Sequence, residues 1–224
     1  MELIKNIPKQ FNDAISTAIT SELRPRHVGH YNASEIGTCY REWYYRYTQP
    51  KQHKDETLRI FQVGHSFHEW VDKLFENSPD FDVIANEKSL LMLDPTTGAV
   101  LHGRLDNLVE FKGEKYLIDT KTTKLIANYP LPDTYKMQLM PYMKMFNVKK
   151  GGILYVEKNT FKTKFIEVPY DESLLQEVFK RLGVIHKALI DKQLPEPEAK
   201  NDKKKKWACG FCQYKEECDK ANER

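Results

Sequence analysis

The chain has 224 residues, of which 40% are hydrophobic and 30% are charged, and its formal net charge is +3. This length allows one sizeable core with a small appended element, and the composition is that of an ordinary globular protein, neither disordered nor membrane-embedded. No run of about 18 apolar residues suggests a spanning helix, and the small net charge does not by itself argue for nucleic acid.

The N-terminal region alternates polar and apolar residues without the uninterrupted apolar stretch of a secretory signal. We therefore expect a cytoplasmic protein. In a reducing compartment, the four cysteines are expected to be metal ligands or free thiols in preference to disulfides.

A helix is predicted from the start of the chain to about Arg26, because Ile15, Ile19 and Leu23 are four residues apart. A second helix is predicted from near Ser34 as its N-cap, carrying Cys39 within it. The aromatic and basic residues that follow can stack bases and contact phosphates, but we favour the commoner role, a partly buried aromatic face. They are Arg41, Trp43, Tyr44, Tyr45, Arg46 and Tyr47.

A long helix is predicted over 55–77, with an apolar stripe of residues three and four positions apart. His68 lies on this stripe, so it should face the core or an internal site, whereas His65 lies off it. A histidine in this position is most often a satisfied core residue. The stripe consists of Phe61, Gly64, His68, Val71 and Phe75.

A strand over 82–93 is predicted to end in a turn over 94–98, and a β-hairpin follows over 102–124 with Lys112-Gly113 at its turn. This turn places Asp106 directly opposite Asp119, and period-two alternation places Lys121 on the same face as Asp119. Facing carboxylates are destabilising unless compensated, most simply by a divalent cation. The alternative is a solvated hairpin face with a salt bridge.

The second half predicts a crossover helix over 133–146, in which Gln138 and Tyr142 share a face and Pro141 introduces a kink. Strands over 153–157 and 164–169 and an amphipathic helix over 171–192 follow. This order predicts an α/β fold with a mixed central β-sheet flanked by helices.

A proline-rich, charged stretch from Leu194 is predicted to be an extended linker. Its four lysines at 203–206 form a run that is usually solvated, with phosphate attraction as the alternative. We expect three segments: an N-terminal helical segment over 1–54, a core over 55–192 and a C-terminal tail over 193–224.

That tail holds Cys209, Cys212 and Cys218, a CxxC pair followed by a third thiol, which is typical of one metal centre. The remaining cysteine is Cys39, and if it completes the site, the centre pins the tail onto the N-terminal helices. Four cysteines can hold either zinc or a four-iron four-sulfur cluster. A redox-active thiol pair is a third, less favoured option, because no βαβ unit lies nearby.

In this combination the chain resembles the PD-(D/E)XK nuclease superfamily, and within it the iron–sulfur branch that includes RecB-type exonucleases and the CRISPR-associated Cas type four nucleases. The resemblance spans nearly the whole chain. It rests on Cys39-Tyr40-Arg41, Gly64 to His68, Gly103 to Asp106, Asp119-Thr120-Lys121, Gln138 to Tyr142 and the terminal cysteine triplet. Gly103-Arg104-Leu105 departs from the proline that the family name places before the first aspartate.

The resemblance implies a restriction-endonuclease-like core with a four-cysteine element, and assigns roles to individual residues. Lys121 is the implied catalytic lysine, Gln138 and Tyr142 support the site and contact DNA, and Glu87 is an additional acidic group near the metal. The implied metal ligands are His68, Asp106, Asp119 and the Thr120 carbonyl. The implied cluster ligands are Cys39, Cys209, Cys212 and Cys218, with iron–sulfur favoured over zinc.

The implied activity is metal-dependent hydrolysis of DNA phosphodiester bonds, by an exonuclease acting on single strands or frayed ends in a prokaryotic or virus-infected cytoplasm. Carboxylate ligands suit Mg²⁺ or Mn²⁺, and the imidazole favours Mn²⁺. No P-loop is present, so any unwinding requires a helicase or another recombination or CRISPR adaptation partner. The alternatives are a catalytically inactive DNA-binding module and a zinc-stapled adaptor protein.

Overall fold

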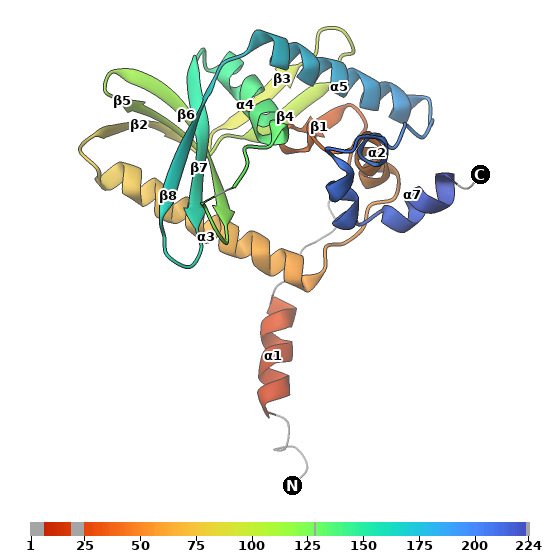
Figure 1. Ribbon diagram of the computed structural model, residues 1–224, viewed down its shortest axis with the longest axis horizontal. Helices are drawn as coiled ribbons and strands as arrows, with labels where there is room; N and C mark the ends of the chain where they lie inside the picture. Colours follow the sequence, from red (N-terminus) through yellow and green to blue (C-terminus); the bar gives the residue numbers. More distant parts are fainter. Residues whose placement is uncertain (1–6, 19–24, 128, 223–224) are drawn as a thin grey trace.

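The protein is described here by a computed structural model that covers residues 7–18, 25–127 and 129–222. Helices enclose two β-sheets (Figure 1). In chain order the elements are α1 (Ile7–Ala18), β1 (His30–Asn32), η1 (Ala33–Glu35), α2 (Tyr40–Thr48), α3 (Asp55–Asn77), β2 (Phe81–Asn86), β3 (Ser89–Leu93), β4 (Val100–Arg104), β5 (Asn107–Phe111), β6 (Glu114–Thr123), α4 (Asp133–Met145), β7 (Lys150–Glu157), β8 (Thr163–Pro169), α5 (Glu172–Ile190), α6 (Glu198–Asn201), η2 (Lys206–Gly210) and α7 (Lys215–Asn222).

The larger sheet has the strand order β2-β5-β6-β7-β8, in which β6 and β7 are parallel and the other neighbours antiparallel. The hairpin turn between β5 and β6 is at Lys112-Gly113, as predicted, and Phe111 pairs with Glu114. Both turn residues have positive φ, of 53° and 78°, the requirement of the tight turn that matches strand twist. Because β7 pairs with its other side, β6 is an interior strand and not a solvated hairpin edge.

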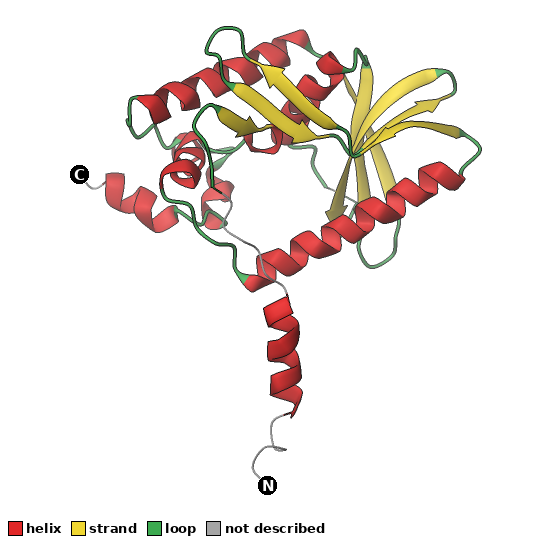
Figure 2. Ribbon diagram, turned by 180° about the vertical axis from the view of Figure 1, so that it is seen from behind, coloured by secondary structure: helices red, strands yellow, loops and turns green. Residues whose placement is uncertain are grey.

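Alternate residues of this sheet supply two cores on its opposite faces. Phe67, Val71 and Phe75 of α3 pack on one face with Val109, Ile118 and Val156. The other face packs against α4, and α5 packs in turn on α4, so the sheet lies between α3 and this helix pair (Figures 1 and 2). The predicted mixed α/β architecture is confirmed.

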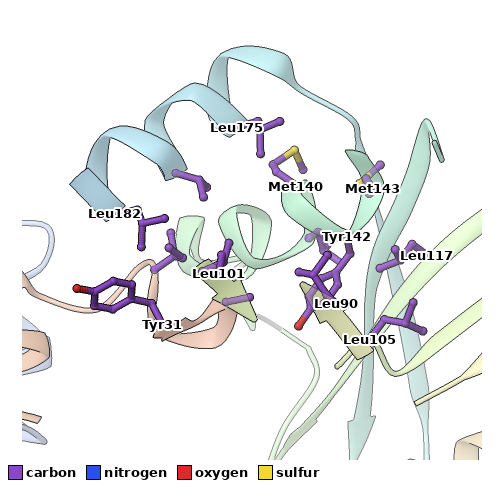
Figure 3. Close-up of a cluster of buried hydrophobic side chains, with 14 of the residues drawn as sticks. Tyr31, Leu90, Leu101, Leu105, Leu117, Met140, Tyr142, Met143, Leu175 and Leu182 are labelled. Carbon is purple, nitrogen blue, oxygen red and sulfur yellow. The ribbon is translucent and has the colours of Figure 1, made fainter. Parts of the chain in front are cut away.

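The smaller sheet has the order β1-β4-β3 and contributes to the second core. Figure 3 shows this core between the strands and the helices, with Leu175 and Leu182 of α5 above Met140 of α4 and Leu101 of β4. Tyr142 belongs to the same buried cluster, which fixes α4 against the strands.

Two predicted strands are each divided between the sheets. The stretch 82–93 becomes β2 and β3, separated at Glu87, whose φ is +50°. The first strand of the predicted hairpin becomes β4 and β5, separated at Leu105-Asp106. Interior strands such as β5 bury residues on both faces, with Leu108 in one core and Val109 in the other, so alternation of apolar residues did not mark the two breaks.

The helix predictions met different outcomes. The helix over 55–77 is confirmed as α3, although its buried residues include Leu58 and Phe67 while Phe61 is 47% exposed. The predicted helix from Ser34 is wrong: a 3₁₀ turn ends at Glu35, and α2 begins only after Cys39. Ile19 and Leu23 lie outside the described residues. α4 is continuous through Pro141.

The C-terminal stretch is not an extended linker throughout. It forms α6, η2 and α7, because Ala199 is buried and Glu198 pairs with Arg181 of α5. Within the described ranges, no helix is long and apolar enough to cross a membrane.

Candidate functional site

Asp119 and Lys121 lie two residues apart on the interior strand β6, on the face covered by α4. Lys121 Nζ is 2.8 Å from Asp119 Oδ2 and lies 5.1 Å from the centre of the Tyr135 ring. Asp119 is 5% exposed, so this carboxylate is buried in the sheet and the alternative of a solvated hairpin face is excluded. The predicted sharing of a face by these two residues is confirmed.

Asp106 lies at the break between β4 and β5. The β5–β6 ladder ends at the pair Asn107 and Ile118, so Asp106 is one position beyond the paired residues and not, as predicted, a ladder partner of Asp119. Its Oδ2 instead accepts a hydrogen bond from the Thr120 backbone N–H at 2.7 Å. The break thus turns Asp106 toward the middle of β6, which brings both carboxylates together.

His68 reaches the same point from α3. Its Nδ1 is 3.4 Å from Asp106 Oδ2, which confirms that the histidine faces an internal site. Burial lowers the pKa of His68, but the hydrogen bond and charge of Asp106 outweigh burial, so the net pKa is raised above 6.5.

Gln138 and Tyr142 of α4 approach from the other side. Gln138 Nε2 donates to Asp119 Oδ1 at 3.1 Å. The Tyr142 hydroxyl is within hydrogen-bonding reach of the Gln138 side chain and the Arg104 backbone, and burial is the main cause that raises its pKa. The predicted shared face of these two residues is therefore present despite Pro141.

Gly103 of the Gly103-Arg104-Leu105-Asp106 motif is required by the position of Tyr142. A Cβ at residue 103 would lie 2.2 Å from Tyr142 Oη and 3.3 Å from Ala33 Cβ. The missing side chain therefore makes room for the tyrosine hydroxyl beside the site.

Gly103→Ala is expected to destabilise the protein by about 1–3 kcal/mol, because it overpacks this contact. Urea unfolding measures the change, and Tyr142→Phe in the same chain should recover part of it by removing the clashing oxygen. Gly64→Ala is the control, because a Cβ there has open space. Equal stabilities of both alanine variants would contradict this role for Gly103.

Glu87 does not join the two aspartates. Its Oε2 lies 2.5 Å from Arg104 Nη1 and its side chain is 42% exposed. Only its backbone N–H reaches Asp106, donating to the carbonyl oxygen at 2.8 Å. The structure thus offers an arginine partner for this carboxylate in place of a metal.

The electrostatics of the carboxylate pair follow from burial. Burial raises the pKa of Asp119 to about 6, although the nearby Lys121 ammonium lowers it. For Lys121 itself burial lowers the pKa, but attraction to Asp119 and Asp106 gives a net rise. Despite the 2.8 Å contact, Asp119 Oδ2 is a buried oxygen that receives no well-angled hydrogen bond. A buried, under-satisfied carboxylate oxygen is a strained arrangement that a cation would relieve.

The donor set of Asp106, Asp119 and His68 fits Mg²⁺ or Mn²⁺ in its chemistry. In the described part of the chain, however, no three His, Cys, Asp or Glu side chains are already arranged to hold a metal ion. Binding a cation here therefore requires these side chains to turn toward one another.

A cavity of about 1360 Å³ opens beside this site and is lined by His68, Thr120 and Lys121. Six of the seven histidines of the chain line it. Basic and aromatic side chains complete its wall, including Arg26, Arg46, Tyr47, Lys51, Tyr135 and Tyr214.

Of the aromatic and basic residues in and beside α2, Arg41, Trp43 and Tyr45 are buried, which confirms the favoured interpretation for these three, whereas Arg46 and Tyr47 line the cavity. Sequence reasoning missed Arg26, His30 and His102, because residues this far apart show no common periodicity. Only the fold brings them to one wall.

The four cysteines line a second, smaller cavity of about 140 Å³ between α2 and the C-terminal tail. The Ala199 N–H donates to Cys39 Sγ at 3.5 Å and the Tyr214 N–H to Cys212 Sγ at 3.4 Å. Burial raises the pKa of Cys212 to about 12. Four thiols, two of which accept backbone N–H hydrogen bonds, suit a thiolate-bound metal or cluster, although the described cysteines too would have to close further on it.

Two arginines tie this cysteine group to the core, of which the sequence pattern singled out Arg41 but not Arg181. Arg181 of α5 donates to the Ile36 and Thr38 carbonyls and to both carboxylate oxygens of Glu198. Arg41 of α2 donates to the Pro195 carbonyl and to Asn222 Oδ1. The segment around Cys39 and the C-terminal tail are thereby held together around the cysteines.

Comparisons with known proteins place these features in a family. The sequence profile of the PD-(D/E)XK nuclease superfamily matches residues 75–219. The fold is similar to the crystal structure of SSO0001, with a TM-score of 0.62 at 17% identity, covering 93% of this chain and 91% of that one. It is also similar to a phage-related exonuclease from Haemophilus somnus 129PT, with a TM-score of 0.52 at 13% identity over 73% of this chain and 96% of that one.

A third similar structure is an alkaline exonuclease from Laribacter hongkongensis, with a TM-score of 0.49 at 14% identity over 74% of this chain and 90% of that one. No curated protein matches the sequence.

Proposed function

The chain belongs to the PD-(D/E)XK nuclease superfamily, and on that premise we propose that it is a divalent-metal-dependent deoxyribonuclease that degrades single-stranded DNA or frayed ends as an exonuclease. The observation that carries the proposal is the meeting of Asp106, Asp119 and Lys121 beside a cavity of about 1360 Å³. Metal dependence is general in this superfamily.

In this proposal Asp106, Asp119, His68 and the Thr120 carbonyl hold Mg²⁺ or Mn²⁺. When bound, such a cation stabilises charge on phosphoryl oxygens and makes water a better nucleophile. Lys121 orients the attacking water and offsets the negative charge that develops on the phosphate. Gln138 fixes Asp119 through its hydrogen bond to Oδ1, while Tyr142 supports the wall of the site. Glu87 remains only a candidate for an additional acidic group.

Single-stranded DNA is favoured as the substrate because the cavity combines aromatic rings with cations. Tyr47 and Phe61 offer ring surface on which bases can stack, and Lys51 lies 4.9 Å from the centre of the buried Tyr214 ring at the cavity wall. Arg26 and Arg46 face the same cavity, partly neutralised by Glu35. The exonuclease assignment draws on the phage-related exonuclease of similar fold. In this proposal, duplex DNA is unwound by a partner protein, which is a helicase or another recombination or CRISPR adaptation protein.

The four cysteines hold a [4Fe–4S] cluster in this proposal, which places the chain in the iron–sulfur branch, near the Cas type four nucleases. Freshly purified anaerobic protein should be brown and contain iron. Colourless protein with stoichiometric zinc and no iron would support the zinc-stapled alternative. Cys39→Ala should speed proteolysis of the C-terminal tail. An unchanged digestion rate would contradict the role of Cys39 as the fourth cluster ligand.

The test of activity is a cleavage assay with 5′- and 3′-labelled single strands in a series of Mg²⁺ and Mn²⁺ concentrations. We expect cleavage with metal and none with EDTA. Binding without cleavage under every metal condition would favour the inactive DNA-binding module. Asp119→Ala should abolish cleavage, and activity that survives this change would contradict the site.

A further inference from the structure

Two large aromatic side chains stand in solvent on the C-terminal tail. Trp207 is 66% exposed and Phe211 is 84% exposed. Their ring centres are 6.4 Å apart with a 65° angle between the rings. Trp207 lies in η2 and Phe211 in the turn between Cys209 and Cys212, so the cysteine loop presents both rings outward. Side chains of this size in water mark a surface that another molecule covers.

Four lysines directly precede Trp207 in the chain. Lys203, Lys204 and Lys206 are exposed, whereas Lys205 pairs with Glu198. The acidic groups Asp219 and Glu217 of α7 are themselves paired with Lys200 and Lys51. We call Trp207, Phe211, Lys203, Lys204 and Lys206 the tail surface. It offers two aromatic rings and exposed positive charge together.

The tail surface is continuous in the chain with the wall of the large cavity. Gln213 and Tyr214, which follow Phe211 closely, line that cavity, and Gln213 Nε2 lies 2.8 Å from His53 Nδ1. Tyr214 also lines the smaller cysteine cavity. Phe211 is only two residues from the exposed Gln213, so it lies close to the rim of the large cavity, and a nucleic acid strand that leaves the cavity past Gln213 reaches Phe211 and Trp207 next.

We propose that the tail surface binds single-stranded nucleic acid outside the cavity, with Trp207 and Phe211 stacking on bases and the lysines contacting phosphates. This inference rests on the proposed function, whose substrate it extends beyond the catalytic cavity. An anionic membrane also attracts lysines and aromatic rings. Continuity with the cavity favours the nucleic acid strand.

The test compares labelled oligo(dT) of about 6 and about 30 nucleotides by fluorescence anisotropy in EDTA, because only the longer strand exceeds a typical single-domain site. Trp207→Ala with Phe211→Ala should weaken the Kd of the longer strand by about 10-fold or more and leave the short one unchanged. Phe11→Ala is the matched control: Phe11 is equally exposed, at 66%, and lies on α1, which projects away from the tail (Figure 1).

Tryptophan emission gives a second readout. The chain has three tryptophans: Trp43 is fully buried, Trp70 on α3 is partly buried and Trp207 is exposed, so the part of the quenching that is lost in Trp207→Phe reports stacking on Trp207. We expect quenching by the longer oligonucleotide in the wild type and much less in Trp207→Phe, which keeps a stacking ring and should keep most of the affinity.

Equal Kd values of the double variant and wild type for the longer strand would overturn the inference. So would a loss of binding to phosphatidylserine vesicles without loss of DNA binding, which would assign the surface to a membrane. Failure of the proposed function looks different, because the wild type would then cleave neither oligonucleotide in Mn²⁺.

Discussion

Lys121→Ala is expected to lower kcat for single-stranded DNA cleavage by about 100- to 1000-fold, the usual effect of removing one group that stabilises transition-state charge. Lys121 is the cation within 2.8 Å of the buried Asp119 carboxylate, and it also lines the large cavity. Its ammonium is therefore positioned to act on a phosphate bound there. Single-turnover cleavage of a 5′-labelled strand in Mn²⁺ measures the change.

Lys124→Ala provides the matched control, because Lys124 is an exposed lysine just beyond the end of β6. This variant should cleave at the wild-type rate. A Lys121 variant that raised KM but kept kcat would show a role in binding alone and contradict the catalytic assignment. Thermal unfolding of both variants separates loss of chemistry from loss of fold.

Arg181→Ala is expected to destabilise the protein by about 3–5 kcal/mol, the range for breaking a buried ion pair by removing one partner. Arg181 is 3% exposed and its guanidinium makes hydrogen bonds to Ile36, Thr38 and Glu198. Without it, the Ile36 and Thr38 carbonyls lose this donor and the Glu198 carboxylate keeps only Lys205 as a side-chain partner. Urea unfolding measures the stability, and limited proteolysis should show earlier release of the C-terminal tail.

Lys180→Ala is the control for this change, since Lys180 is 72% exposed and its ion pair with Glu177, at 3.5 Å, lies on the surface.

The contribution of the Arg181–Glu198 pair to stability depends on pH with a definite sign. Burial raises the pKa of Glu198, but hydrogen bonds to Arg181 and Lys205 outweigh it, so the folded pKa lies below 4.5. The contribution of the pair is therefore full above pH 4.5 and is lost as the pH falls through the folded pKa. The difference in free energy of unfolding between wild type and Arg181→Ala should therefore become smaller as the pH falls below 4.5.

Several local elements were predictable because their signals lie within short segments. The helix over 55–77 follows from apolar spacing, and the turn at Lys112-Gly113 follows from its residue types. The helical face shared by Gln138 and Tyr142 follows from their spacing of four, and Pro141 did not prevent it.

The candidate site was predictable in its members more than in its geometry. Asp119 and Lys121 meet as alternation predicts. Asp106 joins them from the break between β4 and β5, where it accepts a hydrogen bond from Thr120, and not as a paired residue of the β5–β6 ladder. The strand breaks near Glu87 and Asp106 depend on which of two sheets each segment joins. The local hydrophobic pattern does not indicate which of the two sheets a segment joins, so it could not predict where the chain passes from one sheet to the other.

By itself, the sequence determined the long helices, the hairpin turn, the order of the motifs and the spacing of the cysteine triplet, because these depend on neighbours a few residues apart. Only the tertiary structure decided that six histidines share one cavity wall and that Arg181 joins Ile36 and Thr38 to Glu198. Such contacts connect residues far apart in the chain, and packing of the two sheets against α3, α4 and α5 sets which side chains meet.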